Sequence, residues 1–208
     1  AASGSGVSLP AADTAMDSHL LTFTHVSLCT CNPTTDPFRI ISYQEYRTKT
    51  GDAMTLNGVV GAEKISDVYL TNGQYQPKIT IKPGQWVRLE MINAVGDTFI
   101  EAELRAAVTL GQKGIASGCN IRLLALDGVF LYDGVRTPHD DVVLMAPASR
   151  ASIAVMCTTT GTRYLQSNPM VRASDYESGF LQNLLTVEVA GTATSMTEPA
   201  WKAADIER

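Results

Sequence analysis

Hydrophobic and polar residues alternate along several short segments of this chain, most clearly in residues 70–94, which read LTNGQYQPKITIKPGQWVRLEMINA. A period of two is typical of a β-strand, and Asn-Gly and Pro-Gly pairs are typical of turns. The segment therefore predicts a β-hairpin, with one strand after Pro77 and a second from Gln85 to Asn93. On the second strand we expect one face formed by Trp86, Arg88, Glu90 and Ile92 and another formed by Val87, Leu89, Met91 and Asn93.

Similar alternation recurs in residues 20–28, 38–47, 121–126 and 180–189. A helical phase can be drawn through residues 97–110, but we expect a strand in the first part of that segment and at most a short helix before Cys119. About ten short strands with almost no helix predict an all-β sandwich or barrel. We expect its core to contain Trp86 or Val87, Leu89, Leu124, Leu126, Val143 and Val155.

The polar ends of the chain set the predicted domain limits. Residues 1–16 are rich in Ser, Gly and Ala and are predicted to form a flexible arm or linker. Residues 17–190 are predicted to form one domain. Residues 191–208 form a polar tail with one large apolar residue, Trp201, and we expect this tail to be a linker.

Composition narrows the possible functions. The chain has 208 residues, of which 45% are hydrophobic and 18% charged, and its net charge is -5. This hydrophobic content supports a sizeable core, while the negative charge argues against a nucleic-acid surface, which needs a basic stripe. The sequence has no apolar run long enough to span a bilayer.

Two segments resemble the multicopper oxidase family. Residues 70–94 are similar to the run of Asn-Gly, Pro-Gly, alternating Arg and Asn-Ala in the cupredoxin-like middle domain of these enzymes. Residues 123–157 follow the same order as that domain, with Asp127-Gly128, Pro147 and Arg150 at its turns and strand starts. The likeness covers residues 17–190 and is closest in character to algal and protist oxidase-like proteins. It implies a cupredoxin-like Greek-key sandwich, although an immunoglobulin-like sandwich would show the same periodicity.

Copper ligands are the first chemical question that this resemblance raises. A blue-copper centre takes two His, one Cys thiolate and a weak axial ligand such as Met. No His occurs in the thirteen residues after Cys157, TTTGTRYLQSNPM, and the first His after Cys119 is His139. His19 and His25 are six residues apart, about 20 Å along an extended strand. We therefore predict no metal, no cofactor and no catalytic residue on this chain, with copper in flanking domains if a multicopper oxidase parent exists.

Four cysteines permit two disulfides. Cys29 and Cys31 would point to the same face of a strand, so a bond between these two is disfavoured. We predict that Cys119 pairs with Cys29 or Cys31, and that Cys157 is buried in a strand. Oxidised cysteines would indicate an exported protein, either secreted or in an organelle lumen such as the thylakoid lumen.

Charged residues near the turns have simpler interpretations. We expect Arg150 to support the preceding loop as an ion pair or a clamp on a carbonyl, and Asp127 to form a turn with Gly128. The carboxylate pairs Glu101/Glu103 and Asp140/Asp141 are expected on solvated faces. The sequence contains no nucleophile or phosphate-binding motif.

These observations favour a copper-free cupredoxin-like domain that packs against the flanking cupredoxin domains of an oxidase. One alternative is a cupredoxin-like module that serves as a structural or docking subunit of a larger, lumenal assembly with other protein subunits; another is a free-standing copper electron carrier. Exposed apolar residues are then candidates for an interface, unless those near Phe130 cap the end of the sandwich. The candidate interface residues are Phe130, Tyr132 and Trp201.

Overall fold

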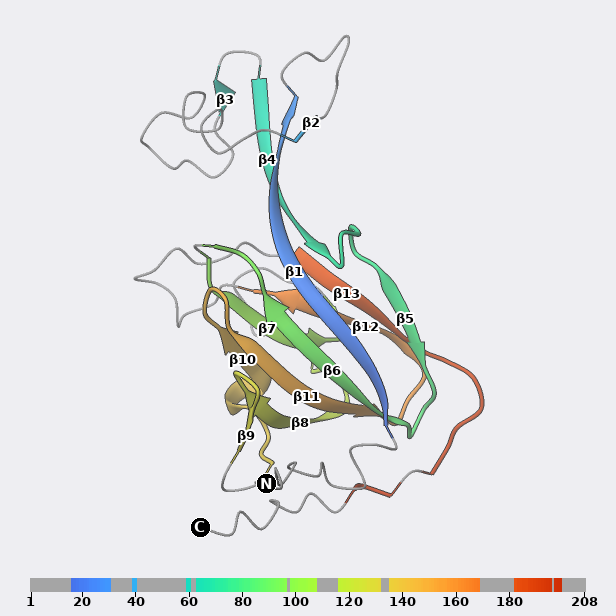
Figure 1. Ribbon diagram of the computed structural model, residues 1–208. Coiled ribbons are helices and arrows are strands. Elements are labelled where there is room, and N and C mark those ends of the chain that lie inside the picture. Colours follow the sequence, from blue (N-terminus) through green and yellow to red (C-terminus); the bar gives the residue numbers. More distant parts are fainter. Residues whose placement is uncertain are drawn as a thin grey trace, which may run out of the picture.

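The computed structural model describes residues 16–30, 39–40, 59–60, 63–96, 98–107, 116–131, 135–168, 182–195 and 197–199. Within these residues two β-sheets face each other across a shared core, as Figure 1 shows. One short 3-10 helix, η1 (His139–Asp141), is the single helical element of the described part. The all-β prediction is confirmed. Tyr132, Trp201 and Cys31 lie outside the described residues.

The first sheet contains eight strands. Its order is β3 (Val59–Val60), β4 (Glu63–Thr71), β1 (Asp17–Thr30), β6 (Trp86–Asn93), β11 (Arg150–Cys157), β8 (Cys119–Leu126) and β9 (Val129–Phe130), with β2 (Arg39–Ile40) also paired to β1. The first part of β1 pairs in parallel with β6, and its second part pairs antiparallel with β4. As Figure 1 shows, β1 and β4 therefore continue together beyond β6, and β2 and β3 pair with their far ends.

The second sheet contains five strands. Its order is β10 (Val142–Met145), β7 (Ile100–Arg105), β12 (Gly161–Ser167), β13 (Gln182–Val189) and β5 (Lys78–Ile81). The pair β13–β5 is parallel and the other pairs are antiparallel. The strand predicted at the start of residues 97–110 is present as β7, while the segment expected to contain a short helix lies outside the described residues.

The predicted hairpin of residues 77–93 is wrong. Its two strands, β5 and β6, belong to different sheets and do not pair. Between them, residues 82–85 form a turn in which the Gln85 N–H donates to the Lys82 carbonyl at 3.1 Å. Pro83 at the second position and a φ of +75° at Gly84 are typical of a type II turn. This turn carries the chain across the sandwich from one sheet to the other.

A second turn of the same kind joins β10 of the second sheet to β11 of the first. The Ser149 N–H donates to the Ala146 carbonyl at 3.0 Å, and Ala148 has a φ of +62° after Pro147. The turns at Pro83 and Pro147 therefore both connect one sheet to the other. The strands on either side of each turn belong to different sheets.

The core lies between the sheets and confirms the predicted faces of β6. Val87, Leu89 and Met91 are buried there. Trp86 is also buried, but on the opposite face of the sheet, in a small second cluster with Met16, Leu124 and Ala154. Of the other predicted core residues, the main cluster contains Val143 and Val155, with Leu126 packed against it.

Asn93 fixes the loops at the end of β6. Its side chain is fully buried, and Nδ2 donates to the carbonyls of Thr98, Met145 and Ala146 at 2.9, 3.2 and 3.1 Å. Its Oδ1 accepts from the Val95 N–H at 3.1 Å. One amide thus supplies partners for backbone groups of two loops, which explains why a buried polar residue ends an otherwise apolar face.

The segment after β13 lies along the sandwich. The Thr194 N–H donates to the Pro83 carbonyl at 2.8 Å, and Glu198 forms an ion pair with Arg122 of β8 at 2.7 Å. Within the predicted tail of residues 191–208, Thr194 thus contacts the turn between β5 and β6, and Glu198 contacts β8. The described part of the chain contains no helix long and apolar enough to cross a membrane.

Candidate functional site

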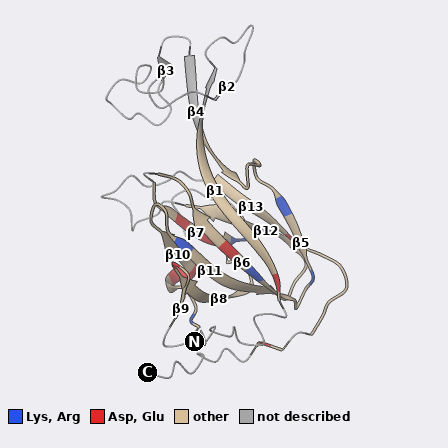
Figure 2. Ribbon diagram, viewed as in Figure 1, with Lys and Arg blue, Asp and Glu red and all other residues tan. Residues whose placement is uncertain are grey.

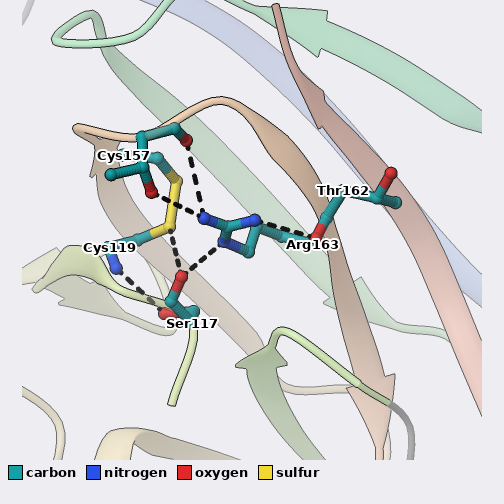
Figure 3. The surroundings of a disulfide bond; sticks show 6 residues. Ser117, Cys119, Cys157, Thr162 and Arg163 are labelled. Carbon is teal, nitrogen blue, oxygen red and sulfur yellow. Dashed lines mark hydrogen bonds between the residues drawn. A yellow bond between two sulfur atoms is a disulfide. The ribbon is translucent and has the colours of Figure 1, made fainter. Parts of the chain in front are cut away.

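Two of the four cysteines are joined to each other. Cys119 at the start of β8 forms a disulfide with Cys157 at the end of β11, as Figure 3 shows. The two residues are direct partners in the antiparallel register of these strands, with 4.1 Å between their Cα atoms. The prediction that Cys119 pairs with Cys29 or Cys31 is therefore corrected, whereas Cys157 is buried in a strand as expected.

Strand order explains this correction. Cys29 lies on β1, and β6 and β11 separate β1 from β8. Three steps between neighbouring strands amount to about 14 Å, which is beyond the reach of a disulfide.

Arg163 of β12 packs against the disulfide from the second sheet (Figure 3). Its Nε donates to the Ser117 carbonyl, and its Nη2 donates to the Thr159 hydroxyl at 2.9 Å. The Cys119 N–H donates in turn to the Ser117 hydroxyl at 3.2 Å. A buried guanidinium thereby ties the entry to β8 to the turn before β12, and its contacts indicate a structural role.

The three histidines do not form a site together. His19 and His25 lie on β1, whereas His139 lies in η1 next to the second sheet. The His25 ring lies 6.1 Å from the Tyr69 ring, and His139 Nδ1 lies 2.8 Å from Asp140 Oδ2. No group of three or more His, Cys, Asp or Glu side chains suited to a metal occurs among the described residues.

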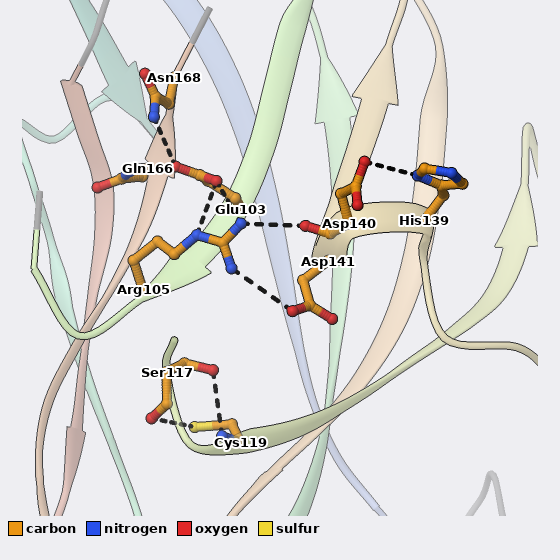
Figure 4. Close-up of polar contacts among 9 residues, drawn as sticks. All are labelled: Glu103, Arg105, Ser117, Cys119, His139, Asp140, Asp141, Gln166 and Asn168. Atoms are coloured by element: carbon orange, nitrogen blue, oxygen red, sulfur yellow. Dashed lines mark hydrogen bonds and ion pairs between the residues drawn. The ribbon is translucent and has the colours of Figure 1, made fainter. Parts of the chain in front are cut away.

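A buried ion pair occupies the outward face of β7. Arg105 Nε donates to Glu103 Oε2 at 2.8 Å, and both side chains are about as buried as the core, at 2% and 1% exposure. Gln166 Nε2 and Asn168 Nδ2 both donate to the other carboxylate oxygen of Glu103, Oε1. Figure 4 shows this network, in which Glu103 and Arg105 lie on β7, Gln166 lies on β12 and Asn168 follows β12. The prediction that Glu101 and Glu103 face solvent is wrong, since both are buried.

The same network holds the η1 segment in place. Arg105 Nη2 donates to the Asp140 carbonyl at 3.1 Å, and Nη1 lies 3.6 Å from a carboxylate oxygen of Asp141, as drawn in Figure 4. Asp140 and Asp141 both have positive φ values, so this short segment departs from a regular helix. The donors saturate Glu103, and the arrangement anchors a loop rather than presenting a free acid or base.

The outward face of the first sheet carries a hollow that is open to solvent. This hollow, of about 100 Å³, lies over β6, β11 and the turn into β9. Figure 2 shows charges of both signs along β6, which runs through it. Its lining includes three apolar side chains, Leu20, Ile92 and Phe130, and three charged ones, Arg88, Glu90 and Arg150.

Phe130 and Arg88 form one wall of this hollow. The Arg88 guanidinium carbon lies 5.8 Å from the centre of the Phe130 ring, a distance typical of a cation–π contact. Arg88 Nε also lies 3.3 Å from Glu90 Oε1 and donates to the Ser152 hydroxyl at 2.8 Å. Phe130 remains 38% exposed and Leu20 57% exposed. Phe130 is thus on the surface, where the sequence analysis placed it as an interface candidate.

Arg150 does not have the role expected from the sequence. The contact with the Asp127 turn is made by the Arg150 backbone N–H, which donates to Asp127 Oδ1 at 2.8 Å. The Arg150 side chain is exposed beside the hollow and forms no ion pair within the described residues. Sequence reasoning also missed Arg88 and Leu20, although the outward phase of Arg88 on β6 was a usable signal.

Comparison with known proteins finds likeness in structure alone. No protein-family model matches the sequence, and no curated protein is significantly similar to it. Solved structures of bacterial oxidases do match the fold. A multi-copper oxidase from Pseudomonas thermotolerans matches with a TM-score of 0.53 and 20% identity over 91% of this chain and 36% of that chain. A Campylobacter jejuni multicopper oxidase, a metallo-oxidase, matches with a TM-score of 0.51 and 15% identity over 95% of this chain and 35% of that chain.

A blue copper oxidase from Nitrosomonas europaea is similar with a TM-score of 0.51 and 18% identity over 88% of this chain and 46% of that chain. The chain therefore spans between about a third and a half of the oxidases named here. The likeness confirms the cupredoxin-like fold of a multicopper oxidase domain. These bacterial structures give no support to the algal or protist affinity.

Proposed function

We propose that this chain acts as a copper-free cupredoxin-like domain whose role is to pack against other domains or subunits. The pairing of Cys119 with Cys157 is the observation that carries the proposal. A blue-copper ligand must be a free thiolate, and a disulfide removes both of these sulfurs from that role. Together with three dispersed histidines, the described residues do not fit a blue-copper centre.

The parent protein under this proposal is a multicopper oxidase that couples substrate oxidation to the reduction of oxygen. The matched oxidases are two to three times longer than the matched part of this chain, so there is room for further domains in such a parent. Copper would then reside in the flanking domains, and this domain would support them without contributing a ligand.

Copper loading tests the proposal directly. The chain is incubated with a copper salt under non-reducing conditions, desalted and analysed for metal and for visible absorption. We expect far less than one copper per chain and no intense thiolate-to-copper band. One tightly held copper with such a band would overturn the proposal and favour a free-standing electron carrier.

A docking subunit of a larger assembly is the second candidate. The exposed Leu20 and Phe130 beside Arg150, whose side chain has no ion pair among the described residues, favour this role, because a surface that mixes exposed apolar and charged groups suits a protein interface. The full reading frame distinguishes the two candidates. His-x-His motifs on either side of these residues would favour the oxidase parent, and their absence together with co-purifying subunits would favour the docking subunit.

We also infer an exported location from the Cys119–Cys157 disulfide, because such bonds persist mainly in oxidising compartments. An organelle lumen remains one form of this prediction. Thiol counting after expression in the bacterial periplasm and in the reducing cytoplasm is a suitable check. We expect the bond only in the periplasmic sample, and a stable fold that keeps both thiols free in each compartment would contradict the inference.

A further inference from the structure

The hollow on the outward face of the first sheet combines an apolar rim with charge. Leu20 of β1 and Phe130 of β9 line it from strands on either side of the β6–β11 pair, and both are substantially exposed. Ile92 of β6 also lines it, and Gly128 leaves one side without a side chain. Exposed apolar residues gathered around one depression are typical of a contact surface rather than of an isolated surface residue.

The charges of the hollow are unbalanced. The Glu90 carboxylate forms an ion pair with Arg88, whose Nε lies 3.3 Å from Glu90 Oε1. The Ser18 hydroxyl donates to the same oxygen at 3.3 Å. The Arg150 guanidinium has no such partner within the described residues. The hollow thus carries one uncompensated positive charge, although the whole chain has a net charge of -5.

We propose that this hollow binds a protein segment of a neighbouring domain or subunit that presents a carboxylate flanked by apolar side chains. The carboxylate pairs with Arg150, which can form two parallel hydrogen bonds to it, and the apolar groups cover Leu20 and Phe130. This inference rests on the proposed function as a packing domain and names the chemistry of the partner.

The same charges argue against other occupants. A second copy of this chain would bring two uncompensated Arg150 side chains together across a two-fold axis. Nucleic acid needs several free cations to neutralise phosphates, whereas Arg88 already contacts Glu90, Ser152 and Phe130. An apolar segment that bears a carboxylate would pair with Arg150 and also cover Leu20 and Phe130.

Isotope-labelled chain titrated with short peptides tests the proposal. The probes are two N-acetylated, C-amidated tripeptides, Leu-Glu-Phe and Leu-Gln-Phe, which differ only in charge. We expect Leu-Glu-Phe to shift the backbone amide resonances of residues 88–92, 127–130 and 150–152, and to bind about fivefold more tightly than Leu-Gln-Phe, as one exposed ion pair allows.

Matched variants assign this preference to the hollow. Arg150→Gln should abolish the difference between the two peptides, while its backbone contact with Asp127 is kept. Lys82→Gln, which removes an exposed cation elsewhere, should preserve the difference. Phe130→Ser should weaken both peptides about equally, whereas Tyr75→Ser, at a 60% exposed aromatic outside the hollow, should weaken neither.

Three results would overturn the inference: equal binding of the two peptides, shifts confined to another surface, or concentration-dependent shifts of the hollow without peptide, which would indicate self-association. Copper analysis of the same samples keeps the two proposals separate. A copper-binding chain that still prefers Leu-Glu-Phe would refute the proposed function alone, and a copper-free chain with no preference would refute this inference alone.

Discussion

Asp127 and Arg150 clamp each other through the backbone. The Asp127 carboxylate accepts from the Arg150 N–H at 2.8 Å, and the Asp127 N–H donates to the Arg150 carbonyl at 2.8 Å. The end of β8 is thereby fixed to the start of β11. Because the clamp uses no atom of the Arg150 side chain, the guanidinium is available to the hollow beside it.

Replacing Asp127 should affect the backbone contact of Arg150 and leave the Arg150 guanidinium beside the hollow. We expect Asp127→Ala to lower the free energy of unfolding by about 1 kcal/mol, because it removes one charge-assisted hydrogen bond and places Ala at a φ of +50°. Asp127→Asn keeps an acceptor and tolerates this φ, so it should lose less than half as much. Urea denaturation measures both, and equal losses for the two variants would contradict the clamp.

Asn93→Ala should be among the more damaging single changes. It leaves the carbonyls of Thr98, Met145 and Ala146 without their buried donor. We expect a loss of about 3 kcal/mol, since each unsatisfied buried group costs on the order of 1 kcal/mol or more. The exposed Asn120→Ala on β8 is the control and should change stability by less than about 0.5 kcal/mol. Similar unfolding midpoints for the two variants would contradict the stabilising role of the Asn93 hydrogen bonds.

Gly73 and Gly84 have the same φ of +75°, but only Gly84 lies close to another part of the chain, so substitutions at the two positions can be compared. A Cβ at Gly84 would lie 1.9 Å from the Thr194 carbonyl oxygen, whereas one at Gly73 would meet nothing within 4 Å. We expect Gly73→Ala to cost about 1 kcal/mol for the left-handed backbone alone. Gly84→Ala should cost at least about 2 kcal/mol more, or release residues 191–195 from the turn. Thermal unfolding compares the two, and equal costs would show that the segment does not sit on this turn.

The buried pair of Glu103 and Arg105 should respond very differently from an exposed one. Arg105→Met leaves the Glu103 carboxylate buried with only amide donors, and we expect it to cost about 3 kcal/mol. Lys78→Met removes the partner of Glu188 on the surface, where both side chains are exposed, and should cost less than about 1 kcal/mol. Chemical denaturation of both variants is the measurement. A small effect of Arg105→Met would mean that water reaches this face of β7.

Peptide mapping without reduction should find Cys119 joined to Cys157. The bond closes a separation of 38 residues, which corresponds to about 4 kcal/mol of loop entropy in the unfolded chain. We therefore expect the double variant Cys119→Ala/Cys157→Ala to lose stability of that order at most. A fragment that links Cys119 to Cys29 or Cys31 would instead restore the pairing expected from the sequence.

The sequence alone was sufficient for features that depend on neighbouring residues. Alternation along β6 correctly separated the core-facing Val87, Leu89 and Met91 from the outward Arg88 and Glu90, because successive side chains of any strand point to opposite faces. Turn positions were equally readable, since Pro fixes φ and Gly permits the positive φ that many turns require. The position of Phe130 just after the Asp127-Gly128 turn was readable in the same way, and its side chain is 38% exposed.

Only the tertiary structure decided which strands pair and what covers their faces. A strand has the same period whether it returns beside its predecessor or crosses to the opposite sheet, so β5 and β6 looked like a hairpin. The partner of Cys119 depends on the register between β8 and β11, which is fixed by contacts distant in sequence. Glu103 looked solvated because burial of an outward face depends on what lies over it. Arg150 belongs to the hollow only because β1, β6, β9 and β11 bring Leu20, Ile92 and Phe130 around it, and such convergence leaves no local signal in the chain.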